Sequence, residues 1–237
     1  MCLIAIAHGA SPRFPLVIAA NRDEDYQRAS HPADFWDDAP DVLGGRDAVA
    51  GGSWLAVSRT GRFAAVTNLR GAQLRSRSRG MLVRGFVASD TAPAAFAEEV
   101  VRQGEAYSAF HLLLGSPHEL VYATPEFHTP LESGVYAITN APNGEEWPKA
   151  TIAAAEMQVA LASDAPEALL ASLMEFMTTT RGAAQIESEV FIAGERYGTR
   201  ASTVIVTTPD EILFAERNFG PGGAALGEMR LFRFGWR

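Results

Sequence analysis

The chain has 237 residues, a length that suits one large domain held together without disulfides. We therefore expect one domain over residues 1–237. Its net charge of −8 and its pI near 5.2 argue against nonspecific binding of nucleic acid. No apolar run approaches the roughly 20 residues of a membrane-spanning helix, so we expect no membrane insertion.

Two buried strands are the first elements that the sequence predicts. Residues 3–8 are apolar in both phases of a period-two pattern, and residues 16–20 form a second apolar run that pairs with the first as a hairpin. The second run leads into the polar cluster Asn21-Arg22-Asp23-Glu24, and sites are often built where a buried strand ends. Residues 27–45 are rich in Asp and Pro, and we expect them to be irregular.

Strands and helices then follow each other in blocks. Strands are predicted at residues 53–57, 63–67, 110–114, 119–123, 134–139, 201–207, 212–216 and 229–234. Helices are predicted at about residues 81–88, 94–103, 148–162 and 166–177, the last two beginning at Pro148 and Pro166. This order predicts an α+β fold with mostly antiparallel sheets. Since several strands are apolar on both faces, two sheets stacked between helical layers, an αββα four-layer sandwich, would explain the pattern.

The only cysteine, Cys2, stands at an unusual position. A lone cysteine cannot form an internal disulfide, and the N-terminus does not read as a signal peptide, so we expect a cytoplasmic location. If Met1 is removed, Cys2 carries both a thiol and an α-amine whose ordinary pKa, near 7.7–8.0, makes it a possible base. A nearby arginine would favour the thiolate, and amide side chains would bind an oxyanion. Candidates at predicted strand ends are Arg22, Asn68, Asn140 and Arg200.

Several motifs, spread over nearly the whole chain, together resemble the NRDE family, which is also called the transport and Golgi organisation 2 family. The motifs are the initial Met-Cys-Leu-Ile, the segments at residues 20–24, 51–55 and 66–68, Thr139-Asn140-Ala141 leading to Trp147-Pro148-Lys149, and residues 197–203. That family resembles, more distantly, the cysteine N-terminal nucleophile (Ntn) hydrolases, which include choloylglycine hydrolases and penicillin V acylases. The resemblance implies an Ntn-hydrolase-like fold.

The resemblance also implies roles for single residues. It implies that Cys2 is the nucleophile, Arg22 the early arginine and Arg200 the late one. It assigns Asn140 to the oxyanion hole and Asn68 to the second asparagine. The site aspartate is Asp23, which lies in the family motif, or Asp25, which gives the hydrolases' Arg-x-x-Asp spacing; we favour Asp23 to hold the Cys2 amine. Asn21, Trp54 and Trp147 are the expected substrate contacts, and the two tryptophans are core residues or pocket walls.

Structural explanations exist for each of these residues. Arg22 and Asp23 could form an ion pair that closes a hairpin. Asn68 and Asn140 could be turn residues in the left-handed conformation. Arg200 could be a surface residue.

The resemblance leaves two functions open. One is a cysteine amidohydrolase or acyltransferase that acts through Cys2 on a small-molecule, non-peptide amide or acyl ligand without a cofactor. The other is a non-catalytic haem- or lipid-binding trafficking protein, in which Cys2 or a histidine binds haem iron and arginines pair with the propionates. The five histidines show no metal-ligand spacing, so no metal site is expected.

Overall fold

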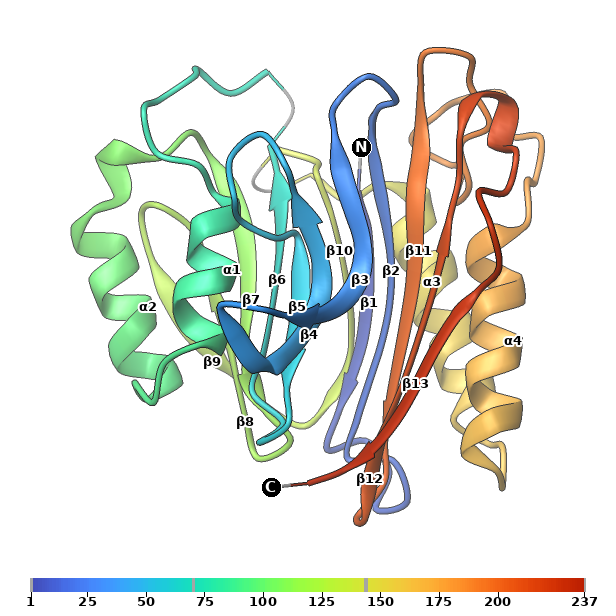
Figure 1. Ribbon diagram of the computed structural model, residues 1–237, viewed down its shortest axis with the longest axis horizontal. Coiled ribbons are helices and arrows are strands. Elements are labelled where there is room, and N and C mark those ends of the chain that lie inside the picture. Colours follow the sequence, from blue (N-terminus) through green and yellow to red (C-terminus); the bar gives the residue numbers. More distant parts are fainter. Residues whose placement is uncertain (1, 70, 143–144, 237) are drawn as a thin grey trace. The chain divides into compact units, whose positions relative to one another are not determined.

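The computed structural model describes residues 2–69, 71–142 and 145–236. The chain divides into two compact units, residues 1–28 with 133–235 and residues 29–132 with 236–237. Each unit contains one sheet, and every strand pair in the two sheets is antiparallel (Figure 1). The α+β class and the antiparallel sheets are therefore confirmed, whereas the expectation of a single domain stays a prediction.

The first unit is built on a six-stranded sheet in the order β10-β1-β2-β11-β12-β13. The strands are β1 (Leu3–His8), β2 (Leu16–Asp25), β10 (Gly134–Thr139), β11 (Tyr197–Thr207), β12 (Glu211–Asn218) and β13 (Arg230–Gly235). The helices of this unit are α3 (Pro148–Ala160), α4 (Pro166–Thr178) and the short 3-10 helix η2 (Pro221–Gly223). Both α-helices begin at the predicted proline, whose fixed φ suits the first helical position.

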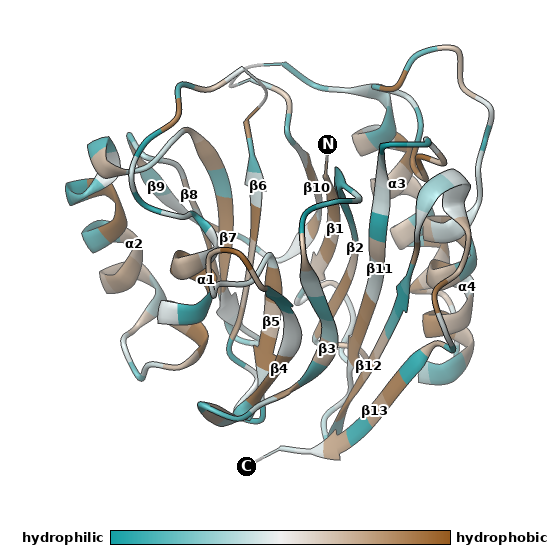
Figure 2. Ribbon diagram, turned by 45° about the horizontal axis from the view of Figure 1, so that its top comes forward, coloured by the Kyte–Doolittle hydropathy of each residue, from teal (hydrophilic) through white to brown (hydrophobic). Residues whose placement is uncertain are grey.

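One face of this sheet packs against α3 and α4. Alternate strand residues such as Leu3, Ala19 and Val204 form a buried cluster with Met157 of α3 and Leu173 of α4. In Figure 2 helix α4 alternates between hydrophobic and hydrophilic residues, as a helix covering a sheet should. Because strand side chains alternate between faces, this cluster identifies the residues that point toward the helices.

The second unit has a seven-stranded sheet in the order β3-β4-β5-β6-β7-β8-β9. Its strands are β3 (Ser30–Trp36), β4 (Ala39–Asp47), β5 (Leu55–Ser58), β6 (Phe63–Asn68), β7 (Phe110–Ser116), β8 (Glu119–Ala123) and β9 (His128–Leu131). Its helices are α1 (Gly80–Val87), α2 (Pro93–Arg102) and the 3-10 helix η1 (Gly104–Ala106). Phe86 of α1 and Ala97 of α2 pack with Ala64 and Leu112 of the sheet in a separate buried cluster.

Three expectations about the strands were wrong. Residues 27–45 are not irregular, because β3 and β4 pair there as a hairpin. Strand β3 is largely exposed and lies at the edge of its sheet, so it lacks the apolar pattern of a buried strand. Strand β9, at the other edge, was missed for the same reason. Strand β2 continues to Asp25, which puts the polar cluster inside the strand.

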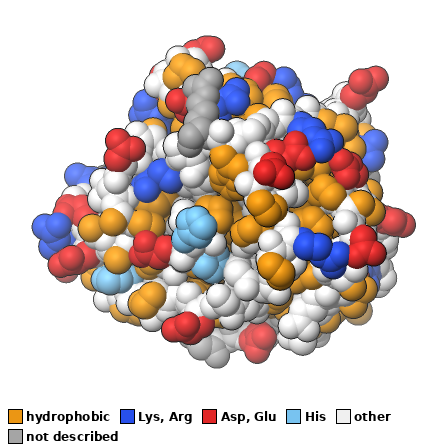
Figure 3. All heavy atoms as spheres, turned by 90° about the horizontal axis from the view of Figure 1, so that it is seen from below, with side chains coloured by type: hydrophobic (Ala, Val, Ile, Leu, Met, Phe, Trp, Pro, Cys, Tyr) orange, Lys and Arg blue, Asp and Glu red, His pale blue; other side chains and the backbone are white. Residues whose placement is uncertain are grey.

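The surface is mixed in charge. On the face that Figure 3 shows, acidic and basic side chains lie interspersed among hydrophobic and neutral ones. Within the described residues, no helix combines the length and apolar character that a membrane crossing needs.

Candidate active site

Three predicted site residues form one row across the sheet of the first unit. The regular pairing of β1 starts at Leu3, which faces β2 on one side and β10 on the other. Continued by one residue, this register sets Cys2 opposite Arg22 of β2 and opposite Asn140, which follows β10. Facing residues of antiparallel strands have Cβ atoms about 4.5–5.5 Å apart and share a face. The strand pairing therefore brings Arg22 and Asn140 to either side of Cys2.

This row points away from helices α3 and α4. Leu3 and Ala19 belong to the cluster that packs on those helices. Cys2, one residue before Leu3, and Arg22, three residues after Ala19, are in the other phase and so project from the opposite face. Asn21 follows the phase of Ala19 and points toward the helices. The polar cluster of β2 is thus divided between the two faces of the sheet.

The thiol that the sequence singled out is free and half-buried. Cys2 directly precedes β1, whose six residues are all buried, so a rigid strand holds it. Met1 lies outside the described residues, and its removal stays a prediction.

Arg22 supplies positive charge beside the thiol position. Its side chain is buried, and one guanidinium nitrogen lies 3.7 Å from a carboxylate oxygen of Glu24. The predicted alternative, an ion pair between Arg22 and Asp23 that closes a hairpin, does not describe this arrangement, because Asp23 pairs with Lys149. The predicted role of Arg22 beside the thiol stays a prediction.

Asp23 is held from three directions. One carboxylate oxygen accepts a hydrogen bond of 2.7 Å from the Thr199 hydroxyl, and the other lies 3.9 Å from the Lys149 ammonium nitrogen. The Tyr197 hydroxyl donates to the main-chain oxygen of Asp23 at 3.0 Å. Burial raises the pKa of the Asp23 carboxyl above its ordinary value, and the nearby Lys149 charge and Thr199 hydrogen bond act in the opposite direction.

Asp25, the alternative site aspartate, lies in a different environment. Its carboxylate accepts hydrogen bonds from the Gln27 main-chain nitrogen at 2.9 Å and from Arg196 at 3.0 Å. These bonds, the Gln27 bond first, hold the pKa of Asp25 below its ordinary value. Asp25 therefore organises the turn after β2, and the choice of Asp23 as the site aspartate stays a prediction.

The side-chain oxygen of Asn140 is buried and unpaired among the described residues. The residue as a whole is also buried. No described residue other than glycine has a positive φ, so the left-handed explanation for Asn140 and Asn68 is wrong. A buried amide beside the nucleophile is the type of group that binds an oxyanion; this role stays a prediction.

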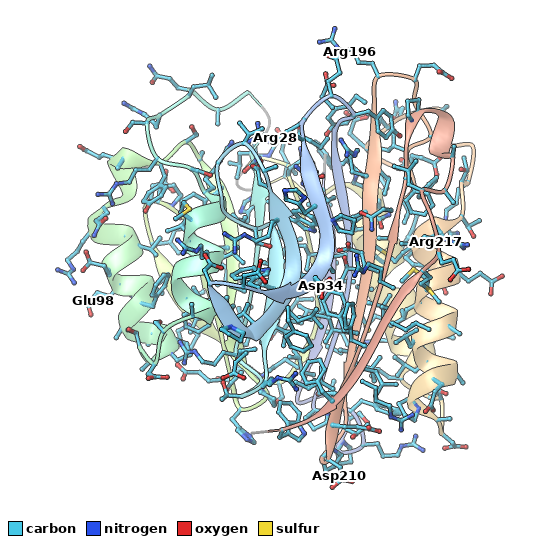
Figure 4. All side chains as sticks on the ribbon, viewed as in Figure 1. Arg28, Asp34, Glu98, Arg196, Asp210 and Arg217 are labelled. Carbon is cyan, nitrogen blue, oxygen red and sulfur yellow. The ribbon has the colours of Figure 1, made fainter. Side chains whose placement is uncertain are left out.

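Arg200 ties down the chain that follows β2. It is half-buried at a break in the β2–β11 register, and one guanidinium nitrogen donates to the main-chain oxygens of Asp25, Tyr26 and Arg28 at 3.3, 2.7 and 3.0 Å. The alternative of a simple surface residue is therefore wrong. Figure 4 labels Arg196, before β11, and Asp210, after it; Arg200 lies toward the Arg196 end.

The side chain of Asn21 is held by two hydrogen bonds to the main chain. Its side-chain nitrogen donates to the main-chain oxygens of Met177 and Val190, both at 2.8 Å. These bonds fasten the end of α4 and the segment around Val190 to the sheet. A substrate contact for Asn21 stays a prediction.

The remaining predicted residues are divided between the units. Trp147 is buried with Ala141, which follows Asn140, and with Ile192, which lies in the segment before β11, and so forms part of a core cluster in the first unit. Asn68 is exposed at the end of β6, and Trp54 is half-buried beside Gly45. Both belong to the second unit, and their participation in the site stays a prediction.

Sequence reasoning missed Lys149, which lies beside the predicted site residue Asp23. Its side chain is fully buried at the start of α3, where it pairs with Asp23. The signal was present, because this is the only lysine among 20 basic residues. Within the described residues, no group of three or more His, Cys, Asp or Glu side chains could hold a metal ion.

Comparison with known sequences supports the resemblance. The model of the family described as Transport and Golgi organisation 2 matches residues 1–221. The chain is 28% identical over 284 residues to the Transport and Golgi organization protein 2 homolog of Homo sapiens, covering 99% of each chain. It is 30% identical over 256 residues to the homolog of Bos taurus, covering 92% of this chain and 93% of the relative. The predicted family is confirmed.

Comparison with solved structures identifies the fold. The chain is similar to a penicillin V acylase from Agrobacterium tumefaciens, with a TM-score of 0.56, 12% identity, and coverage of 99% of this chain and 86% of the acylase. It is similar to a conjugated bile acid hydrolase from Clostridium perfringens, with a TM-score of 0.54, 10% identity, and coverage of 99% and 97%. At these identities the likeness shows the fold alone, which is that of the Ntn hydrolases.

Proposed function

Because the chain belongs to the transport and Golgi organisation 2 family and has the Ntn-hydrolase fold, we propose that it is a cysteine amidohydrolase or acyltransferase. Its nucleophile is the thiol of Cys2, and its α-amine becomes free when Met1 is removed. The observation that carries this proposal is the register that sets Cys2 between Arg22 and Asn140.

The first step is activation of the thiol. The neutral α-amine of Cys2 accepts the thiol proton, and the Arg22 guanidinium stabilises the resulting thiolate. The thiolate attacks the carbonyl carbon of the substrate, so a carbon–sulfur bond forms and the carbonyl oxygen becomes an oxyanion. The side-chain amide of Asn140 donates a hydrogen bond to that oxyanion.

Collapse of this intermediate breaks the carbon–nitrogen bond. The α-ammonium of Cys2 returns a proton to the leaving nitrogen, and the acyl group remains on sulfur as a thioester. Water then attacks the thioester carbon, the carbon–sulfur bond breaks, and the products are a carboxylic acid and the regenerated Cys2 thiol; in acyl transfer a second nucleophile takes the place of water. The substrate class is a small-molecule, non-peptide amide or acyl compound, a class that the names of the structural neighbours, an acylase and a conjugated bile acid hydrolase, support by analogy.

The test requires protein with an untagged N-terminus. Intact mass spectrometry should show loss of Met1, and a thiol-reactive acyl probe should label Cys2 in wild type but not in Cys2→Ala. Two reactions of the variant Asn140→Ala separate the role of Asn140 from that of the thiol. Cys2 of this variant should still be alkylated by iodoacetamide, but it should lose acylation by the probe. Retained methionine in active material, or full activity in Cys2→Ala, would refute the proposal.

A non-catalytic trafficking role is the second candidate, and the names of the curated relatives favour it. In this role Cys2 or a histidine binds haem iron, or the fold carries a lipid. Haem titration that follows the Soret band in wild type and Cys2→Ala distinguishes the candidates. A Cys2-dependent spectrum without acyl-probe labelling favours haem binding, whereas labelling with only nonspecific haem spectra favours the enzyme. The cytoplasmic location stays a prediction.

A further inference from the structure

Lys149 occupies a position that is unfavourable for a lysine. Its side chain is fully buried, and it is the second residue of α3, where the positive end of the helix dipole repels a cation. No described residue hydrogen-bonds to its ammonium nitrogen, which lies 5.6 Å from the centre of the Trp147 ring. Burial and helix position both disfavour this charge, so a specific partner must compensate for it.

That partner is the carboxylate of Asp23, 3.9 Å away and itself fully buried. The opposite carboxylate oxygen is fixed by Thr199. The Thr199 hydroxyl oxygen accepts the main-chain N–H of Ile192 at 2.9 Å, so its hydrogen is directed at Asp23. One oxygen of Asp23 is therefore held by a hydrogen bond and the other by a positive charge.

The choice of lysine over arginine is informative in this chain. Every other basic residue, 20 minus one, is an arginine. Lysine presents a compact point charge on an unbranched stem, whereas arginine presents a broad planar fork. An enclosed site that must place one positive charge near one carboxylate oxygen would select lysine.

Strand direction connects this pair to the nucleophile. Strands β1 and β2 are antiparallel, with Cys2 opposite Arg22 by continuation of the register. The main-chain nitrogen of Cys2 lies on the side of that residue toward the Asp23 end of β2. In the mature protein this nitrogen is the α-amine.

We propose that Lys149 is a positioning residue, whose ammonium keeps the buried Asp23 carboxylate ionised and oriented to hold the α-amine of mature Cys2. This inference rests on the proposed function and deepens it. Among the described residues, Arg22 and the Thr199 hydroxyl also stabilise the Asp23 charge, and that charge in turn raises the pKa of Tyr26 after the larger effect of burial. Without Lys149, less positive charge opposes the effect of burial on Asp23, which favours the protonated carboxyl, and a protonated carboxyl is a poorer acceptor for the α-amine.

A single lysine permits a direct measurement of the pair. Protein grown with isotope-labelled lysine gives one side-chain NMR signal, that of Lys149, whose chemical shift at pH 7 can be compared in wild type and Asp23→Asn. We expect this signal to shift in Asp23→Asn, because the carboxylate 3.9 Å from the ammonium nitrogen is lost. An unchanged signal would overturn the inference.

The pH profile of Cys2 alkylation by iodoacetamide tests the functional part. We expect Lys149→Met to slow alkylation at pH 7 about tenfold and to reproduce the profile of Asp23→Asn. The double variant should slow alkylation no more than either single variant, because both substitutions break the same Lys149–Asp23 pair. Arg181→Met is the matched control, since Arg181 lies at the same 3.9 Å from Glu156 but in a more exposed pair, and it should match wild type.

The outcomes separate the two proposals. A folded Lys149→Met protein with a wild-type alkylation profile means that Lys149 is merely structural. The double variant leaves neither charge of the Lys149–Asp23 pair behind. If Lys149→Met does not fold, the double variant therefore replaces it in the comparison with Asp23→Asn. Failure of the acyl probe to label wild-type Cys2 refutes the proposed function, while the lysine signal still shows whether Lys149 and Asp23 are coupled.

Discussion

Thr199 donates its hydroxyl hydrogen to the carboxylate of Asp23 at 2.7 Å, across directly paired positions of β11 and β2. Both side chains are buried, so the bond cannot be replaced by bulk water. The pairing joins the polar segment of β2, early in the sequence, to a strand that begins more than 170 residues later.

Thr199→Val should destabilise the protein by about 1–3 kcal/mol, because it leaves a buried carboxylate oxygen without its donor. Urea unfolding at pH 7 measures this loss. Thr151→Val is the control, since Thr151 is exposed on α3, and its effect should stay within about 0.5 kcal/mol. Equal losses in the two variants would contradict the assigned role of Thr199.

Asp23 and Asp25 should affect the pH dependence of stability with opposite signs. The folded-state pKa of Asp25 is lowered by Gln27 and Arg196, so its contribution is present above the unfolded pKa of about 3.9 and is lost as pH falls. The folded-state pKa of Asp23 is raised by burial, so its contribution is present below about 3.9 and is lost as pH rises through the folded pKa.

Urea unfolding between pH 3 and pH 7 checks this pair. Asp25→Asn should flatten the rise of stability with increasing pH, whereas Asp23→Asn should steepen it. Slopes that change in the same direction would show that one of the two carboxyls has been assigned the wrong environment.

Arg200→Met should loosen the segment that follows β2. Its guanidinium donates to three main-chain oxygens of residues 25–28, and these would lose that donor. We expect a loss of about 1–3 kcal/mol in unfolding free energy and faster hydrogen exchange around residues 25–28. Arg196→Met, which removes an exposed ion pair with Asp25, should cost clearly less than Arg200→Met.

Asn21→Ala distinguishes a structural role from a substrate contact. Loss of the two bonds to Met177 and Val190 should lower stability by about 1–3 kcal/mol. Iodoacetamide alkylation of Cys2 in the folded variant should be unchanged, and so should the concentration dependence of acyl-probe labelling. A weakened dependence on probe concentration without loss of stability would instead support the predicted substrate contact.

Asn140→Ala should slow acylation of Cys2 about 10²–10³-fold if its amide binds the oxyanion. Stability should change little, because no described residue donates to the Asn140 side-chain oxygen. The acylation rate is measured by stopped flow, and the iodoacetamide alkylation rate is measured on the same variant. Comparison of the two rates separates loss of oxyanion binding from damage to the thiol. Equal slowing of both reactions would argue against the oxyanion role.

The sequence alone determined the elements with strong local signals. Strands β1, β8 and β10 have the predicted bounds, because their apolar runs end at polar or turn residues. Helices α3 and α4 begin at Pro148 and Pro166, where a fixed φ and a missing N–H are favourable. The position of Cys2 and the family motifs were equally visible in the sequence.

Edge strands and the division of site residues between sheet faces required the tertiary structure. Strands β3 and β9 are stabilised by pairing with neighbours, which their own polar sequences do not indicate. Because the sequence suggested that β2 stops at Ala20, it could not show that Arg22 shares a face with Cys2 while Asn21 points toward the helices. Only pairing of β2 with β1 and β11 decides that.

Lys149 is the clearest example of a residue whose environment the sequence could not predict. The sequence determined that Lys149 is the only lysine and stands at the start of a helix. It could not determine that the side chain is fully buried or that Asp23, 126 residues earlier (149 minus 23), is its partner. A charge becomes tolerable in a buried position only when docking of α3 on the sheet brings an opposite charge to it, and that depends on contacts far apart in the chain.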